Sequence, residues 1–440
     1  MKEQIIEIRE FNHDGRGRGV LDGKTYLVSQ AYPGERVSVI VDRSSSKTVQ
    51  GRVANLHEVI PERIDSPCVH LNHCTGCPFI GVTSAVEEDF KRNELSRILS
   101  DAGCGVSDIQ YIRPTGAYHY RHYAKWNLIQ TGNRISVGAY VMGTHSLVEN
   151  QKCQVVTPMI QRVVSRVLSI LNRFKVKIHS DKNRGLRYLI IRQSHVSDRL
   201  LLTIVDSREM FQTEKIRYRL KPEFEQLTEE IDVAWMVNVD DGNVLLSSEW
   251  QPLVGDCILD EALGGIELKV GPETFFQINP CAAEEMFQLV ASWLDGRSVL
   301  ELFSGVGALS VLLAPKVDRL CTLEMNAASV ELADKTMKTL GHDHVTCFQG
   351  DAYRYDVLVD SNQHFDTLVV DPPGKGLGSE LIERIIKSDA TQIIMLACRA
   401  AGLRRDLPLL LSGGFKVERV GLVDQFPRTG QFETMLKLVR

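Results

Sequence analysis

From Ile266 to the C-terminus the chain alternates short apolar segments with amphipathic ones, and this pattern constrains the fold more than any other feature. A helix is expected over Ala282–Leu294, followed by the strand SVLELF, a glycine turn, another helix and the strand RLCTLEM. Regular alternation of strands and helices is typical of a mainly parallel sheet covered on both faces. Region 266–440 is therefore predicted to be a doubly wound, Rossmann-like α/β domain.

Acidic residues and glycines stand where the predicted strands of this region end. Ligands bind at the carboxyl ends of such strands, and glycine lets the backbone approach them closely. The turn after the first strand lacks the third glycine of a dinucleotide fingerprint. The ordered acidic residues instead indicate an S-adenosylmethionine (SAM) methyltransferase domain, with Glu324 placed to bind ribose hydroxyls. A helix cap or a loop acid remains the alternative for Glu324 and for Asp351. The set comprises Glu301, Glu324, Asp351 and the run Asp371-Pro372-Pro373.

A cysteine-rich loop precedes this domain. Cys68, Cys74 and Cys77 lie within ten residues of one another, and Cys153 follows well downstream. Three thiols from one loop and a fourth from a distant position suit an iron–sulfur cluster or a four-cysteine zinc site. Zinc ribbons pair two CxxC knuckles, whereas this chain has one here, which favours the cluster. Spacing alone supports Cys153 as a ligand less strongly than it supports the three loop cysteines.

Charge is distributed unevenly along the chain. The whole sequence carries −5, yet the segment Tyr111–Leu220 holds 19 Lys and Arg against 6 Asp and Glu. Aromatic residues such as Tyr123, Trp126 and Tyr188 are interleaved with these charges. Arginine and lysine contact phosphates while aromatic rings stack on unpaired bases, so the segment is predicted to bind RNA. A solvated charged surface is the alternative.

The first 60 residues contain four or five short alternating segments separated by the turn signals DGRGRG, LDGK and YPGE. This pattern predicts a small OB-like β-barrel, a shape often used to grip oligonucleotides, although a β module without a ligand fits it equally. An amphipathic helix is expected at 85–102. The sequence contains no apolar run long enough for a membrane span and no secretory signal at its start, and its cysteine usage suits the cytosol.

Two further residues stand at strand ends. Cys398 follows the apolar strand Gln392–Ala397 and precedes Arg399, where a thiol near a cation can act as a nucleophile. A buried core cysteine is the alternative. Glu433 opens the last strand, a place where a surface carboxylate is the ordinary interpretation.

Together these segments resemble the RNA uracil-C5 methyltransferases, which make 5-methyluridine from SAM, over essentially the whole chain. The resemblance is carried by the glycine turn, the DPP run, Cys398 and the tail FPRTGQFE. The N-terminal part is similar to a TRAM domain, the cysteine loop to the family's four-iron four-sulfur site, and Phe275–Asn279 to its FFQxN segment. The TRAM-like part and the cysteine loop together make the chain most similar to the branch that methylates large-subunit ribosomal RNA.

The resemblance implies a role for each matching residue. Cys398 would be the nucleophile that adds to C6 of uracil, and Glu433 the base that removes the C5 proton. Residues implied to line the SAM and uracil pocket are Gln277, Phe303, Gly305, Gly307, Glu324, Asp351 and Asp371. Those implied to hold the cluster are Cys68, Cys74, Cys77 and Cys153. Candidates to hold the RNA are Arg121, Lys125, Arg187 and Arg192.

The chain departs from the family pattern around the site. The family's nucleophile usually sits in the run SCNPxTLxRD. Here Cys398 is followed by Arg399 and Ala400, so the Asn-Pro turn of that run is lost. Gly374 stands where the family's DPPR run has its arginine, and Lys375 next to it could supply the cation instead. Gln431 stands where the family often has a histidine, two positions before the base. These changes leave the bond-making groups in place and bear on rate and substrate choice.

The sequence thus predicts three domains: a TRAM/OB-like barrel at 1–60, a central α+β RNA-binding domain at 61–265 and a SAM methyltransferase domain at 266–440. Helix 85–102 is expected to pack with the last of these. A cytoplasmic monomer acting on 23S ribosomal RNA is expected. The alternatives are a transfer-RNA uridine-C5 methyltransferase and a non-catalytic RNA-binding protein that retains the SAM fold.

Overall fold

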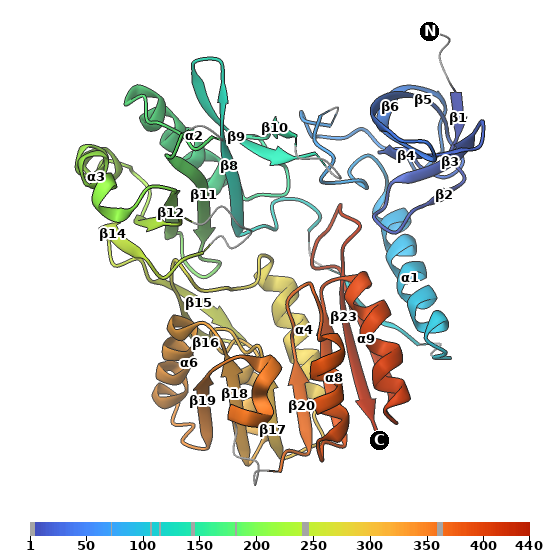
Figure 1. Cartoon of the computed structure of the whole chain (residues 1–440), viewed down its shortest axis with the longest axis vertical. Helices are drawn as coiled ribbons and strands as arrows, with labels where there is room; N and C mark the ends of the chain where they lie inside the picture. The colour runs from blue at the N-terminus through green and yellow to red at the C-terminus, as the bar shows by residue number, and fades with distance from the viewer. Residues whose placement is uncertain are drawn as a thin grey trace.

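The computed structural model of the chain describes residues 5–71, 73–105, 108–113, 116–141, 146–180, 183–239, 246–358 and 364–440. These residues form sheets of six, seven and eight strands and one two-stranded hairpin, seen in Figure 1 as an N-terminal sheet, a central region and a C-terminal α/β unit. Within the described ranges, no helix combines the length and the apolar character needed to cross a membrane.

The N-terminal sheet has the strand order β1-β5-β6-β4-β3-β2. The turn predicted over DGRGRG lies at its first residues, where Gly15 has a φ of 87°, and β3 begins at Gly17. A Cβ on Gly17 would clash with the carbonyl oxygen of Ala31 and lie 2.7 Å from Ile8, so the missing side chain lets the strand pass this close. Next to the β2–β3 pair, the N–H of Arg9 donates to the carbonyl of Arg18 at 2.9 Å. The strands are β1 (Ile5–Glu7), β2 (Glu10–Phe11), β3 (Gly17–Leu21), β4 (Lys24–Ser29), β5 (Arg36–Ser44) and β6 (Thr48–Glu58).

The central sheet has the order β10-β9-β8-β11-β12-β13-β14, and among its described strands only β12 and β13 pair in parallel. Helix α2 (Pro158–Arg173) begins at a proline and is capped by Thr157, as expected for a helix start. Its apolar face packs on the sheet, with α3 (Met210–Glu225) beside it. The strands are β8 (Tyr123–Thr131), β9 (Arg134–Tyr140), β10 (Leu147–Glu149), β11 (Leu186–Gln193), β12 (Leu200–Asp206), β13 (Ile231–Val237) and β14 (Trp250–Val254).

The C-terminal unit follows a hairpin of β15 (Leu259–Leu263) and β16 (Ile266–Val270) and contains the eight-stranded sheet, of order β19-β18-β17-β20-β21-β23-β22-β7. The strands from β19 to β21 are parallel, and β23 is antiparallel to both neighbours. This arrangement confirms the Rossmann-like prediction. The strands are β17 (Ser298–Leu302), β18 (Arg319–Glu324), β19 (Val345–Gln349), β20 (Thr367–Val370), β21 (Gln392–Ala397), β22 (Lys416–Val423) and β23 (Glu433–Val439).

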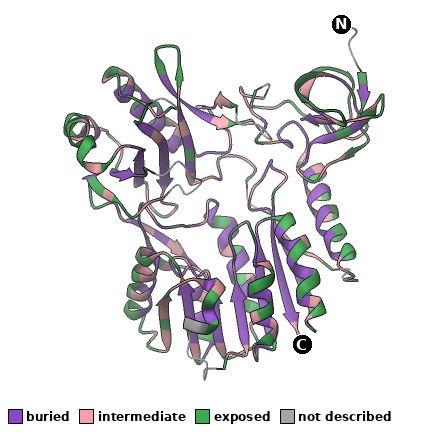
Figure 2. Ribbon diagram, in the orientation of Figure 1, coloured by how far each residue is buried: buried purple, intermediate pink, exposed green. Residues whose placement is uncertain are grey.

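Helices cover this sheet, and Figure 2 shows its strands buried while the outer sides of the helices are exposed. Near-continuous apolar strands such as β21 are expected when both faces of a parallel sheet are covered. The helical segments are α4 (Pro280–Ser292), α5 (Ser310–Leu313), the 3₁₀ turn η1 (Ala314–Lys316), α6 (Ala327–Thr339), the 3₁₀ turn η2 (Ala352–Arg354), α7 (Tyr355–Leu358), α8 (Gly378–Lys387) and α9 (Ala400–Ser412).

Two segments that precede residue 266 also belong to this unit in space. Helix α1 (Ser84–Asp101) packs against α9, and its Leu95, Ile98 and Leu99 share one apolar core with the sheet (Figure 1). The short strand β7 (Gln110–Ile112) extends the sheet by pairing in parallel with β22. The chain therefore passes alongside the C-terminal unit before it enters the central sheet.

Candidate active site at the strand ends

The turn after β17 is shaped to receive a ligand. Phe303, Gly305 and Gly307 all have positive φ, of 66°, 56° and 81°, so the backbone bends sharply where the strand ends. A Cβ on Gly305 would meet no atom within 4 Å, which means that the space above this residue is open. Glu324, the last residue of β18, accepts a hydrogen bond from the Gly305 N–H at 3.1 Å.

A pocket opens beside this turn. Its lining includes Gln277, Phe303, Gly305 and Asp371, four of the residues predicted to contact SAM and uracil, together with the half-exposed Phe275. Open space over a glycine, aromatic side chains and an acidic strand end are what a nucleoside with a charged amino-acid tail requires. The residues present therefore fit SAM.

Asp351 follows β19 at the same sheet edge, directly after Gly350, whose N–H donates to the carbonyl of Glu324 at 2.9 Å. Its carboxylate accepts a hydrogen bond from the N–H of Tyr353 at 3.0 Å and caps the turn η2 after β19. The alternative left open by the sequence, a helix cap, describes the contact that the structure shows. The role of Asp351 in binding SAM stays a prediction.

Strand register brings Cys398 and Glu433 together. Ala397 pairs with Thr434 in the antiparallel ladder of β21 and β23, so the residues immediately beyond this pair lie across from each other. Asp371 follows β20, whose last residue Val370 pairs with Met395 of β21. Three chain segments far apart in sequence thus present a thiol and two carboxyl groups at one edge of the sheet.

The electrostatics of the site favour protonated groups. Burial, reinforced by Glu433 and Asp371, raises the pKa of the Cys398 thiol to about 12, while Arg399 lowers it. Burial also raises the pKa of Asp371 to about 7, and burial with the neighbouring Asp371 raises that of Glu433 well above its usual range. Nearby, burial raises the pKa of Glu301 to about 8. Strongly shifted groups clustered at a pocket are typical of an active site.

The raised thiol pKa gives a first prediction. Only the thiolate reacts with iodoacetamide, so the alkylation rate of Cys398 in the free protein should rise about tenfold per pH unit from pH 7 to pH 10. Mass spectrometry of the peptide that contains Cys398 measures this rate, with a small thiol of pKa about 8.5 as the control. A rate that levels off below pH 9 would show that the thiol is not shielded as described.

The space left by Gly374 is filled by Arg399. A Cβ on Gly374 would lie 2.7 Å from Nε of Arg399, and both residues line a second pocket with Cys398. Lys375, the substitute cation considered from sequence, instead places its Nζ 4.3 Å from the ring centre of Tyr353. Arg399 is therefore the cation next to the thiol, in the place where the sequence set it directly after Cys398.

The four cysteines of the predicted metal site lie within electrostatic reach of one another. Burial raises the pKa of Cys74, and Cys153 and Cys68 raise it further, while Arg121 lowers it. Burial and Cys153 likewise raise the pKa of Cys77. The thiols are thus gathered from the loop and from Cys153, but among the described residues no three His, Cys, Asp or Glu side chains are arranged to hold a metal ion. The cluster stays a prediction.

The basic residues of the central sheet differ in exposure. Lys125 is exposed on β8, and Arg187 lies over the ring of Tyr188 at 5.0 Å. Arg192 is only 6% exposed and donates to the carbonyl of Thr274 at 3.0 Å, next to the pocket segment 275–277. Arg121 donates to Tyr120 beside the cysteine loop. Contact of these four residues with RNA stays a prediction, and the contacts that the structure shows for Arg192 are internal.

Known proteins resemble this chain over nearly its whole length. An uncharacterized RNA methyltransferase of Listeria monocytogenes is 25% identical over 99% of this chain and 98% of its own. Another from Geobacter sulfurreducens is 27% identical over 99% of this chain and 89% of its own. The crystal structure of the Pyrococcus abyssi tRNA (uracil-54, C5)-methyltransferase in complex with S-adenosyl-L-homocysteine has the same fold. Its TM-score is 0.76 at 22% identity, covering 99% of this chain and 100% of that one.

The profile of one protein family matches three quarters of the chain. It is described as tRNA (Uracil-5-)-methyltransferase and covers residues 111–440, which include the pocket at the glycine turn, Cys398 and Glu433. The chain therefore belongs to the tRNA (uracil-5-)-methyltransferase family and is an RNA methyltransferase.

Proposed function

We propose that this protein transfers the methyl group of SAM to C5 of a specific uridine in RNA. The observation that carries the proposal is the register of β21 and β23, which sets Cys398 across from Glu433 beside the glycine-turn pocket. A nucleophilic thiol and a proton-accepting carboxyl at one strand edge are the two groups that this reaction needs.

The chemistry follows from the low reactivity of uracil. C5 is too weak a nucleophile to attack a sulfonium methyl, but addition of the Cys398 thiolate to C6 produces an enolate whose C5 can attack. Glu433 then removes the proton from C5, and the thiolate leaves C6. SAM supplies the methyl group, while Gln277 and Asp371 at the pocket orient the base, and Arg399 favours the thiolate.

The substrate is proposed to be 23S-type ribosomal RNA, and the support is the N-terminal sheet together with the four-cysteine loop. Transfer RNA is the second candidate because the description of the matching family names it. To reach the thiol, the target uridine must leave its stack, which suits an unpaired loop. The protein is further proposed to act as a monomer in the cytoplasm.

Methylation of separated RNAs tests both the proposed reaction and the proposed RNA substrate. Purified protein with methyl-labelled SAM should label ribosomal RNA from a strain that lacks the enzyme, and nucleoside analysis should find 5-methyluridine. Label confined to transfer RNA would replace the ribosomal assignment but keep the reaction. No 5-methyluridine in any RNA, together with retained RNA binding, would mean a non-catalytic binding protein.

We also propose that Cys68, Cys74, Cys77 and Cys153 bind a four-iron four-sulfur cluster with a structural or RNA-positioning role. The support is the thiol-only donor set and the mutual effect of the thiols on their pKa values. Anaerobically purified protein should contain about four iron and four sulfide per chain. The variant Cys77→Ser should lose both, whereas stoichiometric zinc in the unaltered protein would refute the cluster.

A further inference from the structure

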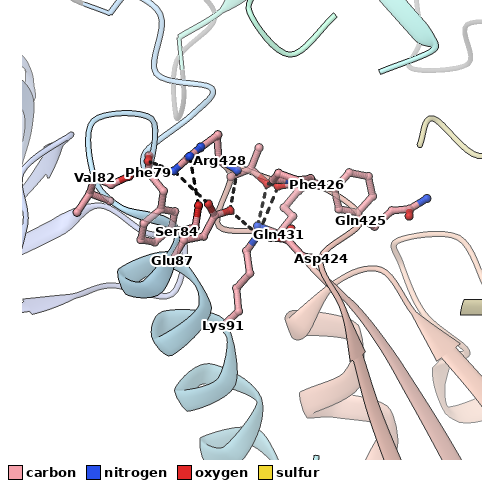
Figure 3. A network of polar contacts seen from close by, with 12 residues as sticks. Phe79, Val82, Ser84, Glu87, Lys91, Asp424, Gln425, Phe426, Arg428 and Gln431 are labelled. Carbon is pink, nitrogen blue, oxygen red and sulfur yellow. Dashed lines mark hydrogen bonds and ion pairs between the residues drawn. The ribbon is translucent and has the colours of Figure 1, made fainter. Parts of the chain in front are cut away.

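A buried group of charges joins helix α1 to the loop 424–432, which precedes Glu433. Lys91 is completely buried, and its Nζ lies 2.7 Å from Oε1 of Glu87 and 2.6 Å from Oδ1 of Asp424 (Figure 3). Both carboxyls contact Lys91, and Glu87 also lies 3.8 Å from the buried guanidinium of Arg428. Burial raises the pKa of Glu87 to about 7, while Lys91 lowers it. The group connects residues more than 300 positions apart in the chain.

The same group holds the main chain of the loop. Nζ of Lys91 donates to the carbonyl of Phe426 at 3.4 Å, and Oε1 of Glu87 accepts from the N–H of Arg428 at 2.6 Å. The guanidinium of Arg428 in turn donates to the carbonyl of Val82 at 2.9 Å, just ahead of α1 (Figure 3). Hydrogen bonds from the first half of α1 and from a residue just ahead of it therefore fix the stretch 424–428 of the loop.

This loop determines where the catalytic carboxyl lies. The ladder of β22 and β23 ends with Val423 paired to Glu433, so the loop 424–432 closes directly on that pair. Oε2 of Glu433 is buried without a hydrogen-bond partner among the described atoms. That carboxylate oxygen is thus placed by its backbone rather than by a bond of its own. Gln425 of the same loop donates to Gln277 of the pocket at 3.1 Å.

A buried lysine with two carboxylates is a poor way to gain stability, because the desolvation of the charges offsets much of their attraction. Replacing such a group with well-packed apolar side chains is often neutral or stabilising. What the charges provide is direction, because each hydrogen bond fixes one atom of the loop. We propose that Lys91 is a positioning residue: by fixing the loop 424–432 it holds the carboxylate of Glu433 where that group can take the C5 proton.

This role rests on the function proposed above and concerns its last step. After methyl transfer, C5 carries both the methyl group and a hydrogen, and C6 is bonded to Sγ of Cys398. Glu433 accepts the C5 proton, the C5–H electron pair forms the C5–C6 double bond, and the C6–S bond breaks to release the thiolate. A misplaced carboxylate slows this elimination and leaves the earlier steps intact. The methylated covalent adduct should then accumulate.

The variant Lys91→Met keeps an unbranched side chain, one atom shorter, and removes the charge. It should complete a first methyl transfer to unmodified RNA at a rate within about threefold of the unaltered enzyme. Release of product should slow at least tenfold, and a protein–RNA band that carries the methyl label should persist in denaturing gels. Single-turnover and steady-state rates measured with labelled SAM give both quantities.

Lys437 supplies a matched control. It is also a buried lysine between two carboxylates, with Glu418 at 3.1 Å and Asp295 as its second partner. It lies on β23 like Glu433, four residues further along and away from the site. Lys437→Met should lower the thermal midpoint without trapping an adduct.

If Lys91→Met fails to fold, the variant Lys91→Met/Asp424→Asn also removes the carboxylate that loses its cation. It keeps Glu87 paired with Arg428 and should fold, while it still accumulates the adduct. Two results would overturn the positioning role. In the first, Lys91→Met shows the same transfer and release rates as Lys437→Met; in the second, all of its steps slow equally and no adduct accumulates. Failure of the proposed function itself is distinct, because the unaltered enzyme would then make no 5-methyluridine at all.

Discussion

Replacing Cys398 by alanine is expected to abolish methyl transfer to RNA, with a loss on the order of 10⁴-fold or more, as for other enzymes that lose their nucleophile. Without addition of a thiolate to C6, C5 of uracil cannot attack the methyl group. The variant should still bind SAM, because the glycine-turn pocket does not depend on this thiol. Methyl incorporation into RNA and SAM binding by calorimetry measure the two effects, and no covalent complex with 5-fluorouridine RNA should form.

Cys281 is the matched control for this prediction. It is an exposed cysteine on α4, and Cys281→Ala should keep the activity of the unaltered protein. Methyl transfer that survives in Cys398→Ala would remove the thiol from the mechanism, whatever the pocket binds.

The substitution Glu433→Gln is expected to stop the reaction after one methyl transfer. The amide keeps the shape of the side chain but cannot accept the C5 proton, so the thiol remains bonded to C6. Steady-state turnover should fall by about 10²–10⁴-fold, the range typical of a lost general base. Nearly every active chain should become linked to methylated RNA, as a labelled band in denaturing gels shows.

Glu383→Gln, which alters an exposed carboxylate on α8, should behave like the unaltered enzyme. Repeated turnover by Glu433→Gln without an adduct would assign proton removal to another group. Asp371 is then the next candidate, because it lies at the same strand edge and its pKa is raised to about 7.

Much of the C-terminal unit is predictable from sequence because each apolar run stops at a polar residue. Strand β21 covers the predicted Gln392–Ala397, and β23 opens at Glu433 as expected. Strand β18 ends at Glu324. Burial on both faces leaves a continuous apolar signal of strand length, and the residue that breaks it marks the edge where ligands bind.

Other features depend on contacts that no local pattern records. Strand β7 has only three residues, and its pairing with β22 joins segments about 310 positions apart. Of the glycines in DGRGRG, Gly15 lies in the turn that the composition indicates, whereas Gly17 lets β3 pass close to Ala31 and Ile8. Lys91 follows Glu87 by four positions, a spacing that ordinarily indicates an exposed helix pair. Its burial is set by Asp424, which only the fold brings near.

The basic segment shows the same limit. Net charge identified a region, but charge alone does not say which side chains face solvent. Lys125 is exposed, whereas Arg192 lies beneath the pocket segment and donates to Thr274. The sign of a segment is therefore predictable, while the surface that it forms requires the structure.

The most direct test of uridine-C5 methylation follows both the bond that forms and the bond that breaks. RNA labelled with tritium at C5 of uridine is incubated with the protein and carbon-14-labelled SAM, and released tritium is compared with incorporated methyl. Methylation at C5 predicts one tritium released for each methyl group gained, and neither signal in Cys398→Ala. Methyl incorporation without tritium release would contradict the account, because the methyl group would then be on another atom.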